Sequence, residues 1–119
     1  MEPPLTWLRA VAEPTRLRLL AVCAEAELTV SDLADILGQS QPRVSRHLKV
    51  LVDAGLLERC REGQWAFYRL VEAGEAGRLA TTLVSLIPDD DPAHAVDLQR
   101  LEKIKRERAA KAEAYFRRN

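Results

Sequence analysis

The side chains with the clearest chemistry in this sequence lie between residues 41 and 52. Apolar residues recur there at the period of one helical face: Val44, Leu48, Leu51 and Val52. At about 100° per residue, Arg46 lies nearly opposite this face, with Arg43 and Lys49 beside it. Cationic side chains bind phosphate, and an arginine fork can also donate two hydrogen bonds to guanine. This pattern is typical of a helix that lies in a DNA groove.

A second expected helix comes just before this one and would position it. Thr29 stands at an N-cap position with Asp32 three residues later, as in a capping box. Gly38 ends this helix, and Ser40 caps the next one. Pro42 follows in the first turn, where its missing N–H has no intrahelical acceptor to lose. Two amphipathic helices separated by such a short turn form a helix-turn-helix, in which the second helix reads the DNA.

Two β-rich runs follow the reader helix and predict a hairpin. They are Leu56–Arg61 and Trp65–Leu70, joined at Glu62-Gly63-Gln64, with Arg61 and Gln64 near the tip. Exposed Arg and Lys on a helical pair can serve solubility alone. A basic hairpin directly after a helix-turn-helix instead favours a winged helix-turn-helix. We therefore expect a mostly α fold with a small β-hairpin wing, in the order α-α-α-α-β-β-α plus a long C-terminal helix.

Several motifs resemble the ArsR/SmtB family of dimeric winged-helix repressors. The likeness covers roughly residues 5–88. It rests on the segments Arg16-Leu17, Glu27–Ala34 and the wing Arg61-Glu62-Gly63, and above all on the pattern S-x-H-L-x-x-L-x-x-A-G-L of residues 45–56. The resemblance implies a transcriptional repressor that binds double-stranded DNA as a homodimer.

The predicted DNA contacts come from the reader helix and the wing. Base contacts are expected from Gln41, Arg43, Ser45 and Arg46. Phosphate or groove-wall contacts are expected from His47 and Lys49, and backbone contacts of the wing from Arg61 and Gln64. Ser40, at the helix start, completes the DNA-binding set.

The resemblance also implies where two subunits meet. The first helix, expected over Leu5–Val11, and the dimerisation helix, expected over Glu72–Ile87, would supply the interface residues Leu5, Trp7, Leu8, Leu79, Leu83 and Leu86. Trp7 has the alternative of packing on its own core. A two-fold dimer places its reader helices about 34 Å apart, which requires an inverted-repeat operator.

The sequence lacks the metal ligands of the resembled family. The soft-metal sensors of that family carry a Cys-x-Cys pair where this chain has Thr29 and Ser31. A second family site uses Asp and His on the dimerisation helix, but the helix expected here contains no histidine. Cys23, on an apolar helix, is most simply a small buried side chain. Cys60 lies between Arg59 and Arg61, which would lower its pKa if it were exposed. No metal is expected, and a thiol redox switch through Cys23 and Cys60 is an alternative.

Residues 89–119 form a second predicted unit, a charged helical extension after the winged-helix domain of residues 1–88. It resembles the connector that joins related winged helices to S-adenosylmethionine-dependent methyltransferases. By analogy, S-adenosylhomocysteine or S-adenosylmethionine is the suspected small effector. The extension could instead wrap its own dimer, and the winged helix could instead be a regulatory or interaction module of a methyltransferase.

Composition bounds these expectations. The 119 residues carry no net charge, yet residues 39–69 hold six basic and three acidic side chains, and residues 98–119 hold eight and three. No apolar run is long enough for a membrane span and no signal peptide is evident, so we expect a cytoplasmic protein without membrane contact. No catalytic constellation or phosphate loop is present, so neither an enzyme nor a cofactor is expected.

Overall fold

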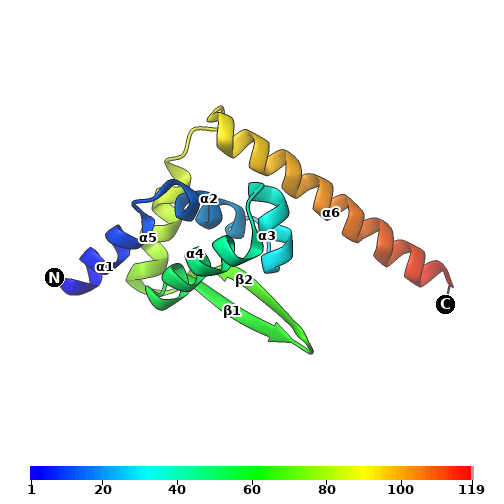
Figure 1. The fold of residues 1–119 in the computed structure, drawn as a ribbon, viewed down its shortest axis with the longest axis horizontal. Helices are drawn as coiled ribbons and strands as arrows, with labels where there is room; N and C mark the ends of the chain where they lie inside the picture. Colours follow the sequence, from blue (N-terminus) through cyan, green and yellow to red (C-terminus); the bar gives the residue numbers. More distant parts are fainter. Residues whose placement is uncertain (119) are drawn as a thin grey trace.

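A computed structural model describes residues 1–118 and shows a mostly helical fold with one β-hairpin (Figure 1). The elements are α1 (Glu2–Val11), α2 (Pro14–Cys23), α3 (Val30–Leu37), α4 (Gln41–Asp53), β1 (Leu57–Glu62), β2 (Trp65–Leu70), α5 (Gly74–Ser85) and α6 (Pro92–Arg118). This order confirms the predicted α-α-α-α-β-β-α arrangement with a long C-terminal helix. The first helix begins three residues earlier than expected, with prolines in its first turn.

Helix α2 lies at the centre of the core. Its residues Leu19, Leu20 and Val22 are fully buried, and Cys23 is nearly so. The helix contacts α1, α3, α4, α5, α6 and β2. Apolar side chains occupy most of the circumference of this helix, and such a helix is buried in a central position.

The helix-turn-helix ends are defined by the predicted caps. The N–H of Asp32 donates to Thr29 Oγ1 at 3.1 Å, and the N–H of Thr29 donates back to Asp32 Oδ2 at 3.0 Å. Gly38 ends α3 with φ of 68°, a left-handed conformation that glycine adopts without a steric penalty. Ser40 Oγ then accepts from the N–H of Arg43 at 3.3 Å and caps α4.

The wing is a two-stranded antiparallel hairpin. Its register runs from Leu57 opposite Leu70 to Glu62 opposite Trp65, so β1 begins one residue later than expected and the turn is only two residues long. At its base, Leu28 and Tyr68 exchange two backbone hydrogen bonds, of 3.2 and 2.8 Å. The hairpin is therefore tied to the segment that leads into α3.

Helix α5 begins at Gly74, two residues later than the predicted start at Glu72. Gly74 has φ of 73°, so the chain turns into the helix there. A Cβ on Gly77 would lie 2.5 Å from the backbone carbon of Glu72, so the helix packs tightly against the preceding segment. The helix ends at Ser85, and Leu86 follows at the C-cap.

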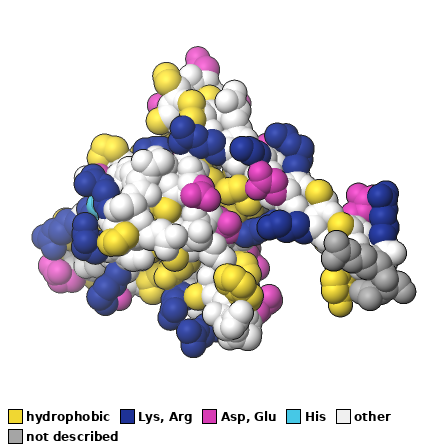
Figure 2. All heavy atoms as spheres, turned by 45° about the vertical axis from the view of Figure 1, so that its right-hand side comes forward, with side chains coloured by type: hydrophobic (Ala, Val, Ile, Leu, Met, Phe, Trp, Pro, Cys, Tyr) yellow, Lys and Arg dark blue, Asp and Glu magenta, His cyan; other side chains and the backbone are white. Residues whose placement is uncertain are grey.

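Helix α6 has a docked half and a projecting half. Leu98, Leu101 and Ile104 pack against the core, and Leu101 is fully buried. The helix contacts α2 and α3. Beyond Arg108 the described side chains of the helix are exposed, and the helix leaves the body (Figure 1), with a hollow between them in Figure 2. The chain does break before α6 near residue 88, but the first half of the extension packs as part of the same core.

Within residues 1–118, no helix combines the length and the apolar character needed to cross a bilayer.

Candidate nucleic-acid interface

Helix α4 is held to the core by one face and exposes the other. Val44, Leu48 and Leu51 are fully buried. The predicted contact residues Gln41, Arg43, Ser45, Arg46 and Lys49 are all exposed. Figure 2 shows Lys and Arg on several parts of the surface with acidic side chains among them, so a contact to DNA would depend on a local cluster of charge.

The cations of α4 differ in how far they are already paired. Arg43 Nε donates to Gln39 Oε1 at 2.9 Å, and Gln39 Nε2 donates to the buried Thr15 Oγ1 at 3.2 Å. Lys49 Nζ lies 3.0 Å from Asp53 Oδ2. Arg46 makes no hydrogen bond or ion pair with any side chain of the described residues. Among the cations of α4, Arg46 is therefore the one most available to a ligand.

His47 lies on the inner side of this cluster. Its side chain is only 18% exposed, and Nδ1 lies 3.3 Å from Arg16 Nη1 and 3.7 Å from Glu13 Oε2. Burial lowers the pKa of His47, and Arg16, Arg43 and Arg46 lower it further against the attraction of Glu13. Arg16 Nη1 can only donate, so this contact gives His47 a structural role within the subunit. The phosphate or groove-wall contact expected of His47 stays a prediction.

Glu13 is the N-cap of α2 and supports His47 and Arg16. Its Oε2 accepts from the N–H of Arg16 at 2.9 Å. Burial alone would raise the pKa of Glu13, but the backbone hydrogen bonds from Arg16 and Thr15 and the charges of His47 and Arg16 together lower it. Sequence reasoning assigned no role to Glu13, Arg16 or Gln39. Only the position of Gln39 in the turn could have drawn attention to it.

The wing exposes Arg61 and Gln64 near its tip, as expected, together with Arg59. Trp65, which sequence reasoning did not select, is 59% exposed beside the turn. At the base, Arg69 donates to Glu58 Oε1 at 2.6 Å and to Glu27 Oε1 at 3.0 Å. Arg59 and Arg61 thus bond to no other side chain of residues 1–118, whereas Arg69 at the base of the hairpin is held by ion pairs.

The predicted interface residues fall on two neighbouring helices. Trp7, Leu8 and Leu79 line a groove of about 340 Å³ between α1 and α5. Trp7 is half-buried and also packs against the core of its own subunit, which was the alternative to a role in the interface. Leu5, Leu79 and Leu83 are half-buried, Leu8 is exposed and Leu86 is 70% exposed.

The two cysteines lie in different environments. Cys23 is buried in the core, and burial raises the pKa of its thiol to about 12. Cys60 is half-buried on β1. Because the thiolate is the reactive form, Cys23 is a poor nucleophile at neutral pH in the folded chain.

We expect a thiol reagent to distinguish them. In the folded protein at pH 7.5, the disulfide reagent DTNB should release about one equivalent of thiolate rapidly, from Cys60, and the second only after urea is added. Cys60→Ser should remove the rapid phase, and Cys23→Ala should leave it. Rapid reaction of Cys23 would instead support the thiol switch.

Thr29 and Ser31, at the positions where soft-metal sensors of the family have cysteines, belong to the start of α3 in this chain. Thr29 caps α3, and Ser31 is exposed in its first turn. Among residues 1–118, no group of three His, Cys, Asp or Glu side chains lies close enough to hold a metal ion.

Comparisons with known proteins place this fold. Residues 13–59 match the family model for bacterial regulatory proteins of the arsR family. The crystal structure of the transcriptional repressor BigR from Xylella fastidiosa is similar, with a TM-score of 0.62 and 34% identity over 68% of this chain and 79% of that one. The chain belongs to the ArsR family.

Two further relatives of this ArsR-family chain are informative. The arsenic resistance transcriptional regulator ArsR1 of Pseudomonas putida is 44% identical over 71 residues, which are 59% of this chain and 55% of that protein. The chain thus aligns with little more than half of that relative. A solution structure from Mycobacterium bovis, a homodimeric winged helix-turn-helix DNA-binding domain, has a TM-score of 0.64 and 29% identity and covers 78% of this chain and 85% of that one.

Proposed function

We propose that this ArsR-family chain is a homodimeric transcriptional repressor that binds an inverted repeat in double-stranded DNA. The observation that carries the proposal is the exposed face of α4, where Arg46 is unpaired among the described residues and Gln41 and Ser45 stand beside it on a rigidly buried helix. A helix with such a face fits into the major groove, where its side chains can donate hydrogen bonds to the edges of the bases. The wing would contact backbone beside it.

The relatives support the same function. BigR is a transcriptional repressor, and the Mycobacterium bovis domain is a homodimer that carries the same winged helix-turn-helix. The apolar side chains exposed on α1 and α5, including Leu8 and Leu86, are suited to pairing with a second copy. A two-fold pair would present two α4 helices and two wings to neighbouring grooves.

Selection from a random DNA pool tests the proposal directly. The purified protein should enrich an inverted repeat, and it should bind that repeat at least about 1,000-fold more tightly than a scrambled duplex at the same salt. Affinity for both duplexes should fall steeply between about 50 and 200 mM KCl, because phosphate contacts release counterions.

The opposite result would support the interaction-module alternative. If no sequence is enriched and binding to all duplexes is weak and nearly independent of salt, the exposed face of α4 contacts another kind of partner. A scrambled duplex of the same length and base composition is the control for non-specific attraction.

We further propose that a small organic molecule, rather than a metal, regulates DNA binding. Thr29 and Ser31 stand at the two positions where soft-metal sensors have cysteines. S-Adenosylhomocysteine and S-adenosylmethionine stay predictions, as does the link to methyltransferases. Any effector must bind the DNA-competent and DNA-incompetent dimers with different affinity.

A further inference from the structure

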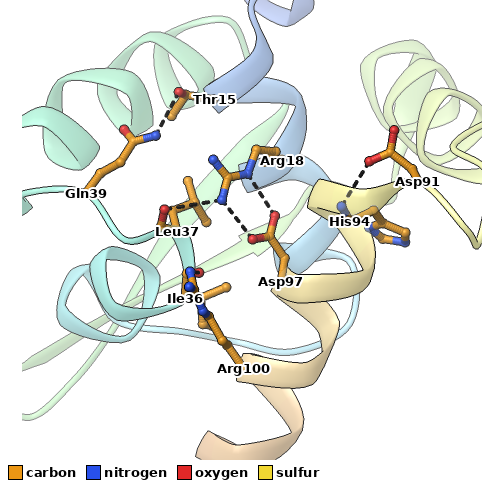
Figure 3. A network of polar contacts seen from close by, with 9 residues as sticks. All are labelled: Thr15, Arg18, Ile36, Leu37, Gln39, Asp91, His94, Asp97 and Arg100. Atoms are coloured by element: carbon orange, nitrogen blue, oxygen red, sulfur yellow. Dashed lines mark hydrogen bonds and ion pairs between the residues drawn. The ribbon is translucent and has the colours of Figure 1, made fainter.

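The docked half of α6 is held to α2 by an ion pair whose carboxylate is buried (Figure 3). Arg18 donates from Nε to Asp97 Oδ2 at 2.9 Å and from Nη2 to Asp97 Oδ1 at 2.8 Å. The Asp97 side chain is only 1% exposed, whereas the Arg18 side chain is 26% exposed, so the carboxylate is removed from water and the guanidinium only in part. Arg18 Nη2 also donates to the backbone carbonyl of Leu37, the last residue of α3, at 3.2 Å.

A second arginine reaches the same end of α3 from α6 itself. Arg100 Nη1 donates to the carbonyl of Ile36 at 2.8 Å. The same nitrogen lies so close to the turn that a Cβ on Gly38 would be 3.4 Å from it. The last carbonyls of a helix lack intrahelical partners and carry partial negative charge. Arg18 and Arg100 therefore satisfy two of these carbonyls where the chain leaves α3 for α4.

The turn continues this network to the candidate interface. Gln39 donates to Thr15 on α2, and it accepts from Arg43 Nε on α4. Hydrogen bonds thus connect Asp97 on α6 to Arg18 and Arg18 to the carbonyl of Leu37. The backbone then leads from Leu37 to Gln39, whose side chain bonds to Arg43 on α4. The path joins segments far apart in the sequence, since Arg18 and Asp97 are separated by 79 positions.

The far end of the docked half contacts the other end of α3. Arg108 forms an ion pair with Asp32, the capping-box residue, and donates from Nη1 to the carbonyl of Glu27 at 3.2 Å. Helix α6 therefore spans α3 from its last carbonyls to its first turn. Both ends of the first helix of the helix-turn-helix are bound to a segment outside it.

We propose that the docked half of α6 belongs to the DNA-reading unit, with Arg18, Asp97 and Arg100 as positioning residues that set the angle between α3 and α4. The proposal rests on the DNA-binding function proposed above. Side chains that read a partner must be held within about 0.5 Å by the shell behind them. The arginines at the turn supply that shell for α4, although none of them needs to touch DNA.

The test compares two variants of α6 that lose the same charge. Arg100→Gln removes the contact to Ile36, whereas Lys103→Gln alters an exposed side chain that bonds to no described residue. Arg100→Gln should weaken binding to the selected inverted repeat about tenfold relative to Lys103→Gln, because a charge-assisted hydrogen bond is lost. Both variants should bind a scrambled duplex equally. Equal binding of the two variants to the inverted repeat would overturn the proposal.

A second measurement needs no DNA. Hydrogen–deuterium exchange of residues 38–43 should be faster in Arg100→Gln and in Arg18→Lys, which keeps the charge but loses the arginine fork, than in Lys103→Gln. Residues 57–70 of the wing should exchange as in the unmodified protein. Exchange that is unchanged at the turn would overturn the proposal. If the unmodified protein selects no DNA, the proposed function fails, and exchange still decides whether α6 holds the turn.

Discussion

Leu86→Glu is expected to convert the dimer into a monomer and to weaken binding to an inverted repeat by at least about 100-fold. Leu86 is 70% exposed in the single chain, so a glutamate there leaves the core of the subunit intact. In a dimer the same carboxylate would be buried against an apolar face without a partner. Two half-sites bound by separate monomers lose the high effective concentration that the dimer gives the second site.

The control for this variant is Val96→Glu, the same substitution at an apolar side chain that is exposed on α6. Light scattering gives the mass of each variant, and fluorescence anisotropy gives its affinity for the selected repeat. A dimeric Leu86→Glu variant with unchanged affinity would show that Leu86, at the C-cap of α5, lies outside the interface.

Arg46→Ala should lower affinity for the inverted repeat by about 2 to 6 kcal/mol per dimer, because each of two copies loses a base contact of about 1 to 3 kcal/mol. Arg46 is unpaired among the described residues and exposed, so its removal should not affect folding. The loss should be largest on the selected sequence and smaller on a scrambled duplex. Competition binding against variants of each base pair would identify the position that Arg46 reads.

Arg106→Ala provides the matched control, since Arg106 is an exposed arginine on α6 that bonds to no described residue. It removes the same charge, and its effect should be small and equal on all duplexes. If Arg46→Ala weakens every duplex equally and reduces the salt slope of the dimer by about 2, one for each copy of Arg46, then Arg46 contacts phosphate instead.

The local parts of this fold could be predicted because their signals lie within a few residues. Thr29 and Asp32 cap a helix through atoms three positions apart, and Gly38 ends it by its own conformational freedom. The apolar period of α4 predicted both its buried and its exposed face. The second wing strand has the predicted bounds, and the first is displaced by only one residue, because a two-residue turn and a three-residue turn have similar composition.

The contacts between distant segments could not be predicted in this way. Arg18 and Asp97 each appear in the sequence as ordinary charged residues, and only their 2.8 Å approach shows that they form a pair. The docked half of α6 packs through Leu98, Leu101 and Ile104, and it also depends on arginines that contact the backbone carbonyls of Ile36 in α3 and of Glu27 before α3. His47 lies on α4 beside exposed arginines, but the sequence does not show that Glu13 and Arg16 lie against it.

The paired backbone of Leu28 and Tyr68 bears on the geometry of the DNA that such a protein accepts. This bridge joins the base of the wing to the segment that leads into the helix-turn-helix, so it limits how far the hairpin can move relative to α3 and α4 within a subunit. Each subunit would therefore contact its half of the operator with a restricted distance between α4 and the wing. If the chain binds DNA as proposed, the separation between the bases beneath α4 and the phosphates beneath the wing is restricted in each half-site, and variable spacing is tolerated more readily between the two halves of the operator.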